Sequence, residues 1–244
     1  MMEESEMNLT ERYRQIESVT KYSNYYLGRC YTWLSTPITE LAARMGMHPN
    51  AMTLISLVLG LAACGLFLVG DRTFLVIGAV VLYLSYVLDW CDGQLARFTG
   101  KMSPFGGWLD QMCDRIKEFA FVSTLAVGAF KLYGDVTVFY WAMGSLFVLF
   151  LLEYYGQMNR AIPESQAAQE TAAAVAPASP QMGRPTDGRK KIVIDFSIDE
   201  QYAVVCLLIV LAGAKGTLIG VTLIGLLFAV YKPLLAWLRY FRTN

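Results

Sequence analysis

Four aspartates near the middle of the chain have the type and spacing of metal ligands. Asp89 and Asp92 are three residues apart, and Asp110 and Asp114 are four residues apart, so each pair shares one face of a helix. The Ser-Pro pair at 103–104 between them is typical of a helix N-cap followed by the first helical residue. We therefore expect two antiparallel neighbouring helices whose carboxylates converge.

All four candidate ligands offer oxygen, which favours Mg²⁺ or Mn²⁺, or Ca²⁺, over zinc. Two divalent cations would balance the four negative charges. The single histidine, His48, stands alone, and the five cysteines show no C-x-x-C spacing, so neither a zinc site nor a disulfide framework is indicated. Two other interpretations stay open: a cation relay in a transporter, or ordinary ion pairs with the basic residues nearby (Arg97, Lys101, Arg115 and Lys117).

Small residues accompany the aspartates along the same helix faces. These positions, Gly93, Ala96, Gly106 and Gly107, leave room either for close helix packing or for a ligand, and beside a metal centre they favour a phosphate-bearing ligand. Arg97 offers a planar set of donors for a phosphate oxygen, although an ion pair at the helix end would also explain it.

Composition places these elements in a membrane. Of the 244 residues, 55% are hydrophobic and 16% are charged, and the formal net charge is zero. The charge balance excludes a generally basic nucleic-acid binder, and the apolar excess predicts an all-α polytopic membrane protein. We expect six transmembrane helices at about 50–70, 73–98, 104–132, 136–159, 199–213 and 216–241.

The distribution of basic residues predicts the orientation of these six helices. Seventeen of the 20 basic residues fall on the side of the two termini, and only Arg72, Lys131 and Lys215 fall on the other side. The positive-inside rule then puts both termini and the acidic site in the cytosol, at the cytoplasmic (inner) membrane. A five-span alternative, with residues 199–241 forming one broken hairpin, would break this bias at the C-terminus.

Two segments differ from the spans. Residues 1–47 are too polar to cross a bilayer, yet their interleaved aromatic and basic residues predict an amphipathic helix lying in the membrane interface. Residues 48–244 would form the six-span domain. Within it, the Ala- and Pro-rich stretch at about 160–195 is typical of a flexible cytosolic loop, either an insertion without function or a flap over the site.

Read together, residues 89–114 resemble the signature of the CDP-alcohol phosphotransferase family. The string D-x-x-D-G-x-x-A-R, eight residues, then G-x-x-x-D-x-x-x-D matches each fixed position of that signature with its spacing intact. The resemblance extends to the number of spans and to a P-N-x-x-T element, residues 49–53, at the start of the first one. It covers about residues 33–241 and includes nothing like the cytidylyltransferase domain that some members carry.

The resemblance implies a homodimer and a metal-dependent reaction in which an acceptor hydroxyl attacks the β-phosphorus of a CDP-alcohol and releases CMP. Metal ligation carries over to the four aspartates, and Asp114 is also the implied general base. The positions implied to line the CDP pocket are Gly93, Ala96, Arg97 and Gly106. Asn50 and Thr53 are further candidates for nucleotide contact, although Asn50 as an N-cap is an alternative.

The alcohols themselves are less constrained. We expect a lipid donor, CDP-diacylglycerol, and a polar acceptor that carries phosphate, such as inositol phosphate or glycerol phosphate, in phospholipid biosynthesis. The basic residues near the site, Arg115, Lys117 and Arg160, are candidates for binding that acceptor. The alternatives are the joining of two polar alcohols, as in di-inositol phosphate synthesis, and a non-enzymatic transporter or scaffold.

Overall fold

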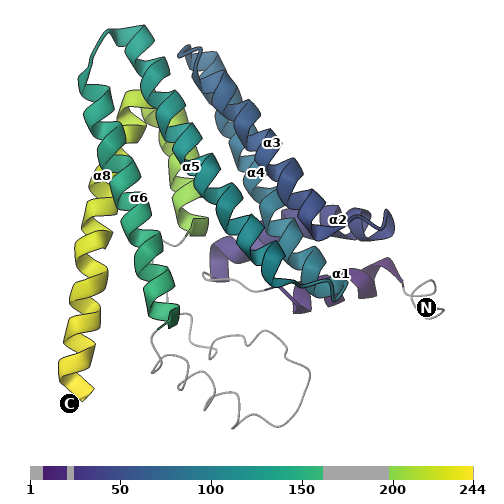
Figure 1. Ribbon diagram of the computed structural model, residues 1–244. Coiled ribbons are helices and arrows are strands. Elements are labelled where there is room, and N and C mark those ends of the chain that lie inside the picture. Colours follow the sequence, from purple (N-terminus) through teal and green to yellow (C-terminus); the bar gives the residue numbers. More distant parts are fainter. Residues whose placement is uncertain (1–7, 21–24, 162–197, 244) are drawn as a thin grey trace.

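The structure, a computed structural model, describes residues 8–20, 25–161 and 198–243 (Figure 1). Within these ranges every regular element is a helix, and no strand occurs. The helices are α1 (Leu9–Ser18), α2 (Tyr25–Arg44), α3 (Pro49–Phe67), α4 (Arg72–Phe98), α5 (Pro104–Tyr133), α6 (Thr137–Ala161) and α8 (Ile198–Thr243). The all-α prediction is confirmed for this part of the chain.

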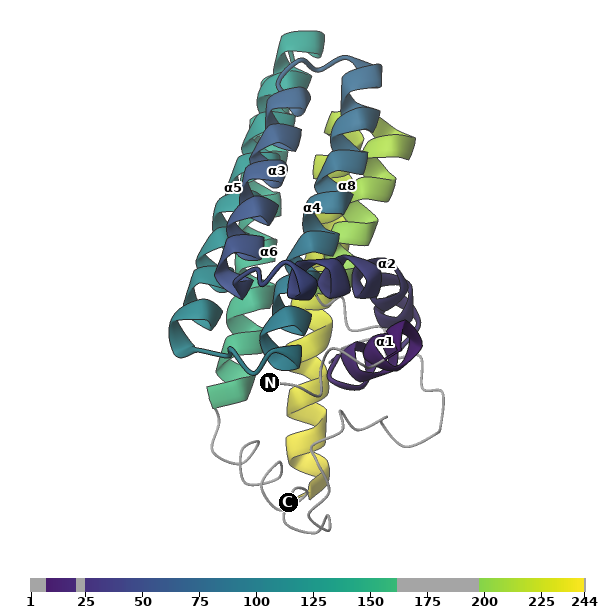
Figure 2. The ribbon, with the colours of Figure 1, turned by 90° about the vertical axis from the view of Figure 1, so that its right-hand side faces the viewer.

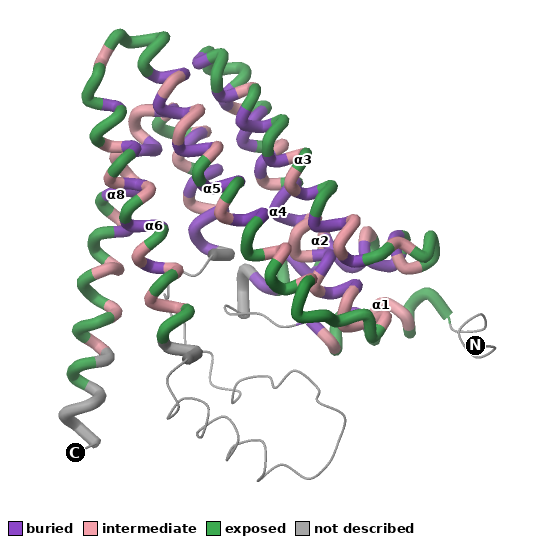
Figure 3. The backbone as a smooth tube through the Cα atoms, viewed as in Figure 1, coloured by how far each residue is buried: buried purple, intermediate pink, exposed green. Residues whose placement is uncertain are grey.

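Four of the described helices are long and apolar enough to cross a membrane. They are α3, α4, α6 and α8, with the candidate segments 49–67, 72–98, 137–158 and 200–235. Large apolar side chains such as Val58, Phe147 and Leu227 point outward, and exposed positions run along the outer faces of the bundle (Figure 3). An apolar exterior on apolar helices of this length marks an integral membrane protein. Helix α5, with 30 residues, is longer than α3, α4 and α6, but its first half carries the charged residues of the predicted site.

Helix α8 is broken near its middle. Gly213 has φ 70° and ψ −175°, and the segments before and after it run in opposite directions (Figure 1). Glycine suits this position because other residues rarely adopt a positive φ. Arg72 donates hydrogen bonds to the carbonyl oxygens of Ile209 and Val210, which lie in the last turn before the break. The sequence places the end of one apolar segment at this residue, and the structure confirms a break there.

Helix α3 packs closely against both α4 and α5, whereas α4 and α5 meet each other very little. Ser85 of α4 donates a buried hydrogen bond of 2.7 Å to the carbonyl oxygen of Ser56 in α3. Near the other end of α3, a Cβ atom at Gly128 of α5 would lie 2.1 Å from the carbonyl oxygen of Phe67. Side chains larger than hydrogen are therefore excluded at this crossing, and α3 is held against both neighbours.

Helices α1 and α2 lie across the end of the bundle where α4 ends and α5 begins (Figure 2). Buried polar side chains attach them: Thr39 donates to Gln94 Oε1 at 2.8 Å, and Gln94 Nε2 donates to Thr20 at 2.9 Å. Arg12 and Arg44 both bind Glu40, each at 2.7 Å. The N-terminal helices are thus fixed to α4 within two residues of Asp92.

The N-caps predicted for two helices can be compared with the structure, and one is confirmed while the other is wrong. Ser103 accepts a hydrogen bond from the amide of Gly106 at 2.9 Å, which confirms the predicted start of α5. At the start of α3, the N-cap is His48, whose Nδ1 accepts from the amide of Asn50 at 3.2 Å. The alternative in which Asn50 is the cap is therefore wrong, because the chain enters the helix two residues earlier, with Pro49 at the first helical position.

Candidate metal and nucleotide site

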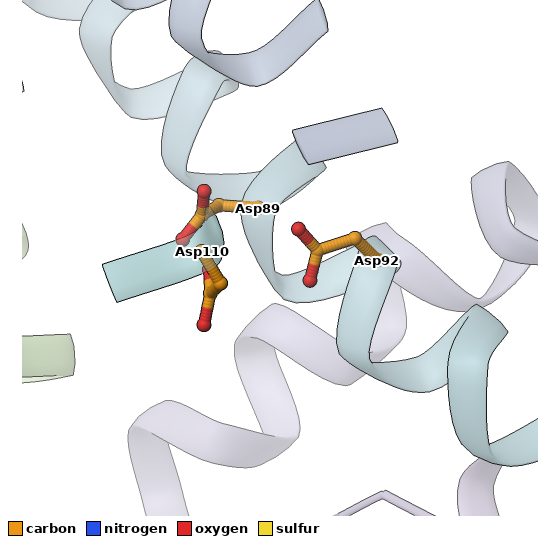
Figure 4. A group of neighbouring side chains, drawn as sticks. All are labelled: Asp89, Asp92 and Asp110. Atoms are coloured by element: carbon orange, nitrogen blue, oxygen red, sulfur yellow. The ribbon is translucent and has the colours of Figure 1, made fainter. Parts of the chain in front are cut away.

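Three of the four aspartates converge. Asp89 and Asp92 come from the C-terminal half of α4, and Asp110 comes from the second turn of α5. Each offers one carboxylate oxygen, and these oxygens all lie within 4.8 Å of one another (Figure 4). The spacing and the all-oxygen donor set fit a hard divalent cation such as Mg²⁺ or Mn²⁺. Asp114, one turn further along α5, is outside this group.

Helix α3 orients the two aspartates of α4. Thr53 donates a buried hydrogen bond of 2.5 Å to Asp92 Oδ2, and Ser56 Oγ lies 3.0 Å from Asp89 Oδ1. Thr53 and Ser56 are three residues apart, as Asp89 and Asp92 are, so the antiparallel helices place the two pairs in register. Groups that hold metal ligands in this way set their orientation. Thr53 therefore supports a carboxylate as well as lining the predicted nucleotide site.

A buried lysine lies on the other side of the carboxylates. Lys117 Nζ is 2.7 Å from Asp89 Oδ1 and 3.0 Å from Asp114 Oδ1, and its side chain has no exposed surface. A buried position of this kind does not fit the expected role of Lys117 in binding the acceptor substrate. An ion-pair interpretation accounts for Asp89 and Asp114, but among the described residues Asp92 and Asp110 have no basic partner within ion-pair distance.

A pocket of about 220 Å³ opens beside the three converging carboxylates, and Asp92 and Asp110 are part of its wall. All six residues proposed for CDP binding line it: Asn50, Thr53, Gly93, Ala96, Arg97 and Gly106. The remaining wall residues are Pro49, Lys101, Met102, Ser103 and Gly107. Small side chains and one guanidinium next to carboxylates suit a phosphate-bearing ligand held through a cation.

The small residues give Arg97 and Asn50 their places in the pocket. A Cβ atom at Gly93 would lie 3.3 Å from Arg97 Nη2, and one at Gly106 would lie 3.1 Å from Asn50 Oδ1. Arg97 Nε is buried and has no hydrogen-bond partner among the described residues. Arg97 also makes no ion pair with any described residue. The structure therefore does not support the alternative in which Arg97 only forms a salt bridge at the end of its helix. Its guanidinium is available to a ligand in the pocket.

A second acceptor candidate, Arg115, also lies outside the pocket wall. Arg115 binds Glu118 at 2.5 Å and approaches Glu153 of α6 at 3.9 Å. Arg160 is in the last turn of α6, outside the residues whose side chains the structure describes. The basic side chain that does line the pocket beside Arg97 is Lys101, which the sequence suggested only as an ion-pair partner.

Ser56 is the part of the site that sequence reasoning missed, whereas Lys117 was named both as an acceptor candidate and as an ordinary ion-pair partner. The spacing of Ser56 from Thr53 repeats the spacing of the two aspartates on α4, and Lys117 follows Asp114 by three residues, which places both on one helix face. These signals were present in the sequence. Their meaning depends on which helices are neighbours.

Fold and site together define an integral membrane protein with a carboxylate-lined pocket formed by α3, α4 and α5. The sequence profile of the CDP-alcohol phosphatidyltransferase family matches residues 46–182, which is more than half of the chain and includes every residue of the pocket. The chain belongs to this family, a family of transferases.

Curated relatives with assigned activities match a smaller part. An archaetidylinositol phosphate synthase of Pyrococcus horikoshii is 34% identical over 100 residues, 41% of this chain and 51% of the relative. A phosphatidylinositol phosphate synthase of Mycolicibacterium smegmatis is 36% identical over 101 residues, 40% of this chain and 44% of the relative. A bifunctional IPC transferase and DIPP synthase of Archaeoglobus fulgidus is 38% identical over 102 residues, 38% of this chain and 20% of the relative. The chain thus spans about half or less of the length of these relatives.

Solved structures share the fold over most of the chain. The phosphatidylinositol phosphate synthase of Mycobacterium tuberculosis with CDP-DAG bound has a TM-score of 0.56 and 18% identity, covering 81% of this chain and 90% of that one. The same enzyme in complex with manganese and citrate has a TM-score of 0.54 and 19% identity, covering 83% and 88%. At this identity the likeness establishes the fold.

Proposed function

We propose that this protein transfers a phosphatidyl group from CDP-diacylglycerol to the hydroxyl of a polar, phosphate-bearing acceptor and releases CMP. The observation that carries the proposal is the convergence of Asp89, Asp92 and Asp110 beside a pocket that holds the guanidinium of Arg97. A pyrophosphate needs positive charge on its oxygens and space for its own bulk. The cation site, the arginine and the glycines supply both.

The four aspartates are the proposed ligands of two divalent cations, Mg²⁺ or Mn²⁺. Bound there, such ions would neutralise the pyrophosphate and the charge that develops on departing CMP. Thr53 and Ser56 hold two of the ligands in place. Asp114 is the proposed general base, and it lies one helical turn beyond the pocket residue Asp110.

The remaining pocket residues bind the CDP moiety in this proposal. Arg97 donates to a phosphate oxygen, Asn50 contacts the nucleotide, and Gly93, Ala96 and Gly106 keep the cavity open. Lys101 on the same wall is a better placed cation for an acceptor phosphate than Lys117, which is buried behind the carboxylates.

Inositol phosphate is the acceptor that the relatives favour. Two of them are named as archaetidylinositol phosphate and phosphatidylinositol phosphate synthases, and one solved structure of the same fold holds CDP-DAG. The lipid donor also suits a pocket built into the helices of a membrane protein.

We further propose six membrane spans: α3, α4, α5, α6 and the two halves of α8. As one straight helix, the 36-residue apolar segment of α8 would measure about 54 Å, too long for a hydrocarbon core of about 30 Å, and the reversal at Gly213 divides it in two. The site end of the bundle, with both termini, faces the cytosol in this proposal, and α1 and α2 lie in the interface. Modification of single introduced cysteines from either side of the membrane tests this topology.

A homodimer in the cytoplasmic membrane completes the proposal, on the strength of the family resemblance. Outward apolar residues on α3, among them Leu54, Ile55 and Val58, offer a surface for helix contact within the bilayer. The molar mass of the protein in detergent, measured by light scattering with the detergent contribution subtracted, distinguishes one copy from two.

The activity is tested with purified protein in detergent and Mn²⁺. CDP-diacylglycerol is supplied with inositol phosphate, with glycerol phosphate or with no acceptor, and CMP release and the lipid product are measured. Acceptor-dependent CMP release with inositol phosphate supports the proposal. If no polar acceptor yields CMP from CDP-diacylglycerol, the lipid donor is wrong.

The second candidate is the joining of two polar alcohols. It is favoured by the 38% identity to a bifunctional enzyme whose name includes DIPP synthase. Replacing the lipid donor by CDP-inositol in the same assay separates the two candidates. A transporter or scaffold would be indicated instead if the variant Asp92→Asn kept the physiological function of the wild type, since an enzyme of this kind needs that ligand.

A further inference from the structure

Lys117 is a buried cation inside an acidic site. Its ammonium donates hydrogen bonds to Asp89 Oδ1 at 2.7 Å and to Ser56 Oγ at 3.2 Å. It also lies within ion-pair distance, 3.0 Å, of Asp114 Oδ1, an oxygen that has no hydrogen-bond partner among the described residues. Its side chain has no exposed surface. Lys117 is therefore paired with two carboxylates of the protein, and substrate contact does not explain its presence.

The fold makes space for this side chain. A Cβ atom at Gly60 of α3 would lie 3.1 Å from both Cγ and Cδ of Lys117, so glycine lets the aliphatic stem pass between α3 and α5. The ring of Tyr202, from the first half of α8, lies 6.0 Å from the ammonium. Three helices thus surround the lysine, and its position is determined by packing as well as by charge.

We propose that Lys117 is a resident counter-ion that makes the two halves of the acidic site unequal. Asp92 and Asp110 have no basic partner within ion-pair distance in the described part of the chain, and Asp89 meets Lys117 through Oδ1. Two of the three carboxylates in this group thus carry an uncompensated charge, so this half takes a divalent cation readily. Asp114 shares its charge with Lys117, so a second cation there must displace or share the space with an ammonium. This inference rests on the metal dependence in the proposed function.

The physical reason is direct competition for the same oxygens. An ammonium 3.0 Å from Asp114 occupies one coordination direction of that carboxylate and repels a second cation at close range. Buried charges that are already paired need no further partner, and removing one partner leaves the other unpaired at considerable cost. Without metal, Lys117 consequently offsets one of the two negative charges of Asp89 and Asp114.

The test is a Mn²⁺ titration of the purified protein without substrates, followed by electron paramagnetic resonance of free Mn²⁺. For the wild type we expect one tight ion per chain and a second that binds at least about tenfold more weakly. In Lys117→Met the second ion should tighten until the two affinities differ by less than about threefold. Lys131→Met removes the same charge from the far end of α5, where Lys131 donates to the carbonyl oxygen of Leu68 at 3.3 Å, and should behave as the wild type.

Thermal unfolding gives an independent readout. In EDTA, Lys117→Met should unfold at a lower temperature than the wild type, and Mn²⁺ should restore most of the loss, because the ion replaces the missing counter-charge. Lys131→Met should show no such dependence on Mn²⁺. An equal loss for Lys117→Met with and without Mn²⁺ would overturn the counter-ion role.

A second variant keeps the proposal testable if Lys117→Met does not fold. Asp114→Asn should retain the tight ion and lose the weak one, because the tight half does not include Asp114. Two equally tight ions in the wild type, or loss of the tight ion in Asp114→Asn, would refute the inference. If the protein binds one tight and one weak Mn²⁺ ion but has no transferase activity, the proposed function is refuted and this inference stands.

Discussion

Removing the hydroxyl of Thr53 tests how far the metal site depends on α3. Thr53→Val keeps the shape of the side chain and deletes the donor that lies 2.5 Å from Asp92 Oδ2. Asp92 then loses a buried hydrogen bond and gains rotational freedom. The expected result is a weaker cation site in a protein that still folds.

The size of the effect follows from the charge on the acceptor. A hydrogen bond to an ionised group contributes about 1.5–3 kcal/mol, and about 1.4 kcal/mol corresponds to a factor of ten in affinity. Mn²⁺ binding should therefore weaken by about 10- to 150-fold. The same range is typical when the partner of a metal ligand is removed.

The measurement is Mn²⁺ affinity without nucleotide, together with kcat and KM for CMP release at saturating Mn²⁺. Thr124→Val is the matched control, since its hydroxyl donates to the carbonyl of Ala120 at 2.8 Å on α5 and touches no aspartate of the site. This control should leave Mn²⁺ affinity unchanged.

Two results would contradict the reasoning. Unchanged Mn²⁺ affinity in Thr53→Val would mean that Asp92 is positioned without this hydrogen bond. A rise in KM for the CDP-alcohol with unchanged Mn²⁺ affinity would show that Thr53 acts by touching the nucleotide, as the sequence also suggested.

Three further outcomes are expected. Gly60→Ala should lower the free energy of unfolding by about 1–3 kcal/mol, because its Cβ would lie 2.9 Å from Ser85 Oγ and 3.1 Å from the stem of Lys117. Gly65→Ala on the same helix meets no atom within 4 Å and should be neutral or stabilising, and thermal unfolding of both variants decides this. The hydrogen bond from Lys215 lowers the pKa of Asp135 to about 2, so this ion pair stabilises the folded chain above the ordinary carboxyl pKa of 3.8 and is lost toward about pH 2. The difference in Tm between the wild type and Asp135→Asn should accordingly shrink over that interval, and a constant difference would argue against the pair. Finally, EDTA should abolish CMP release and Mg²⁺ or Mn²⁺ should restore it, whereas activity that survives chelation would exclude a metal-dependent reaction.

The sequence alone was sufficient for the features that depend on near neighbours in the chain. The three- and four-residue spacings put each pair of aspartates on one helix face, and the Ser-Pro pair at 103–104 started α5 where predicted. Gly213 marked the break in α8. Each of these depends on the covalent geometry of a few consecutive residues, which the tertiary structure does not alter.

Contacts between helices were decided only by the tertiary structure. Nothing in the order of residues says that Lys117 meets Asp89 from another helix, or that Thr53 meets Asp92, because both contacts depend on the register in which antiparallel helices pack. For the same reason the sequence left two roles open for Lys117, acceptor binding and an ion pair, and only the packing shows that it pairs with Asp89 and Asp114. Side-chain types therefore predicted the chemistry of the site, while packing determined which charges balance one another within it.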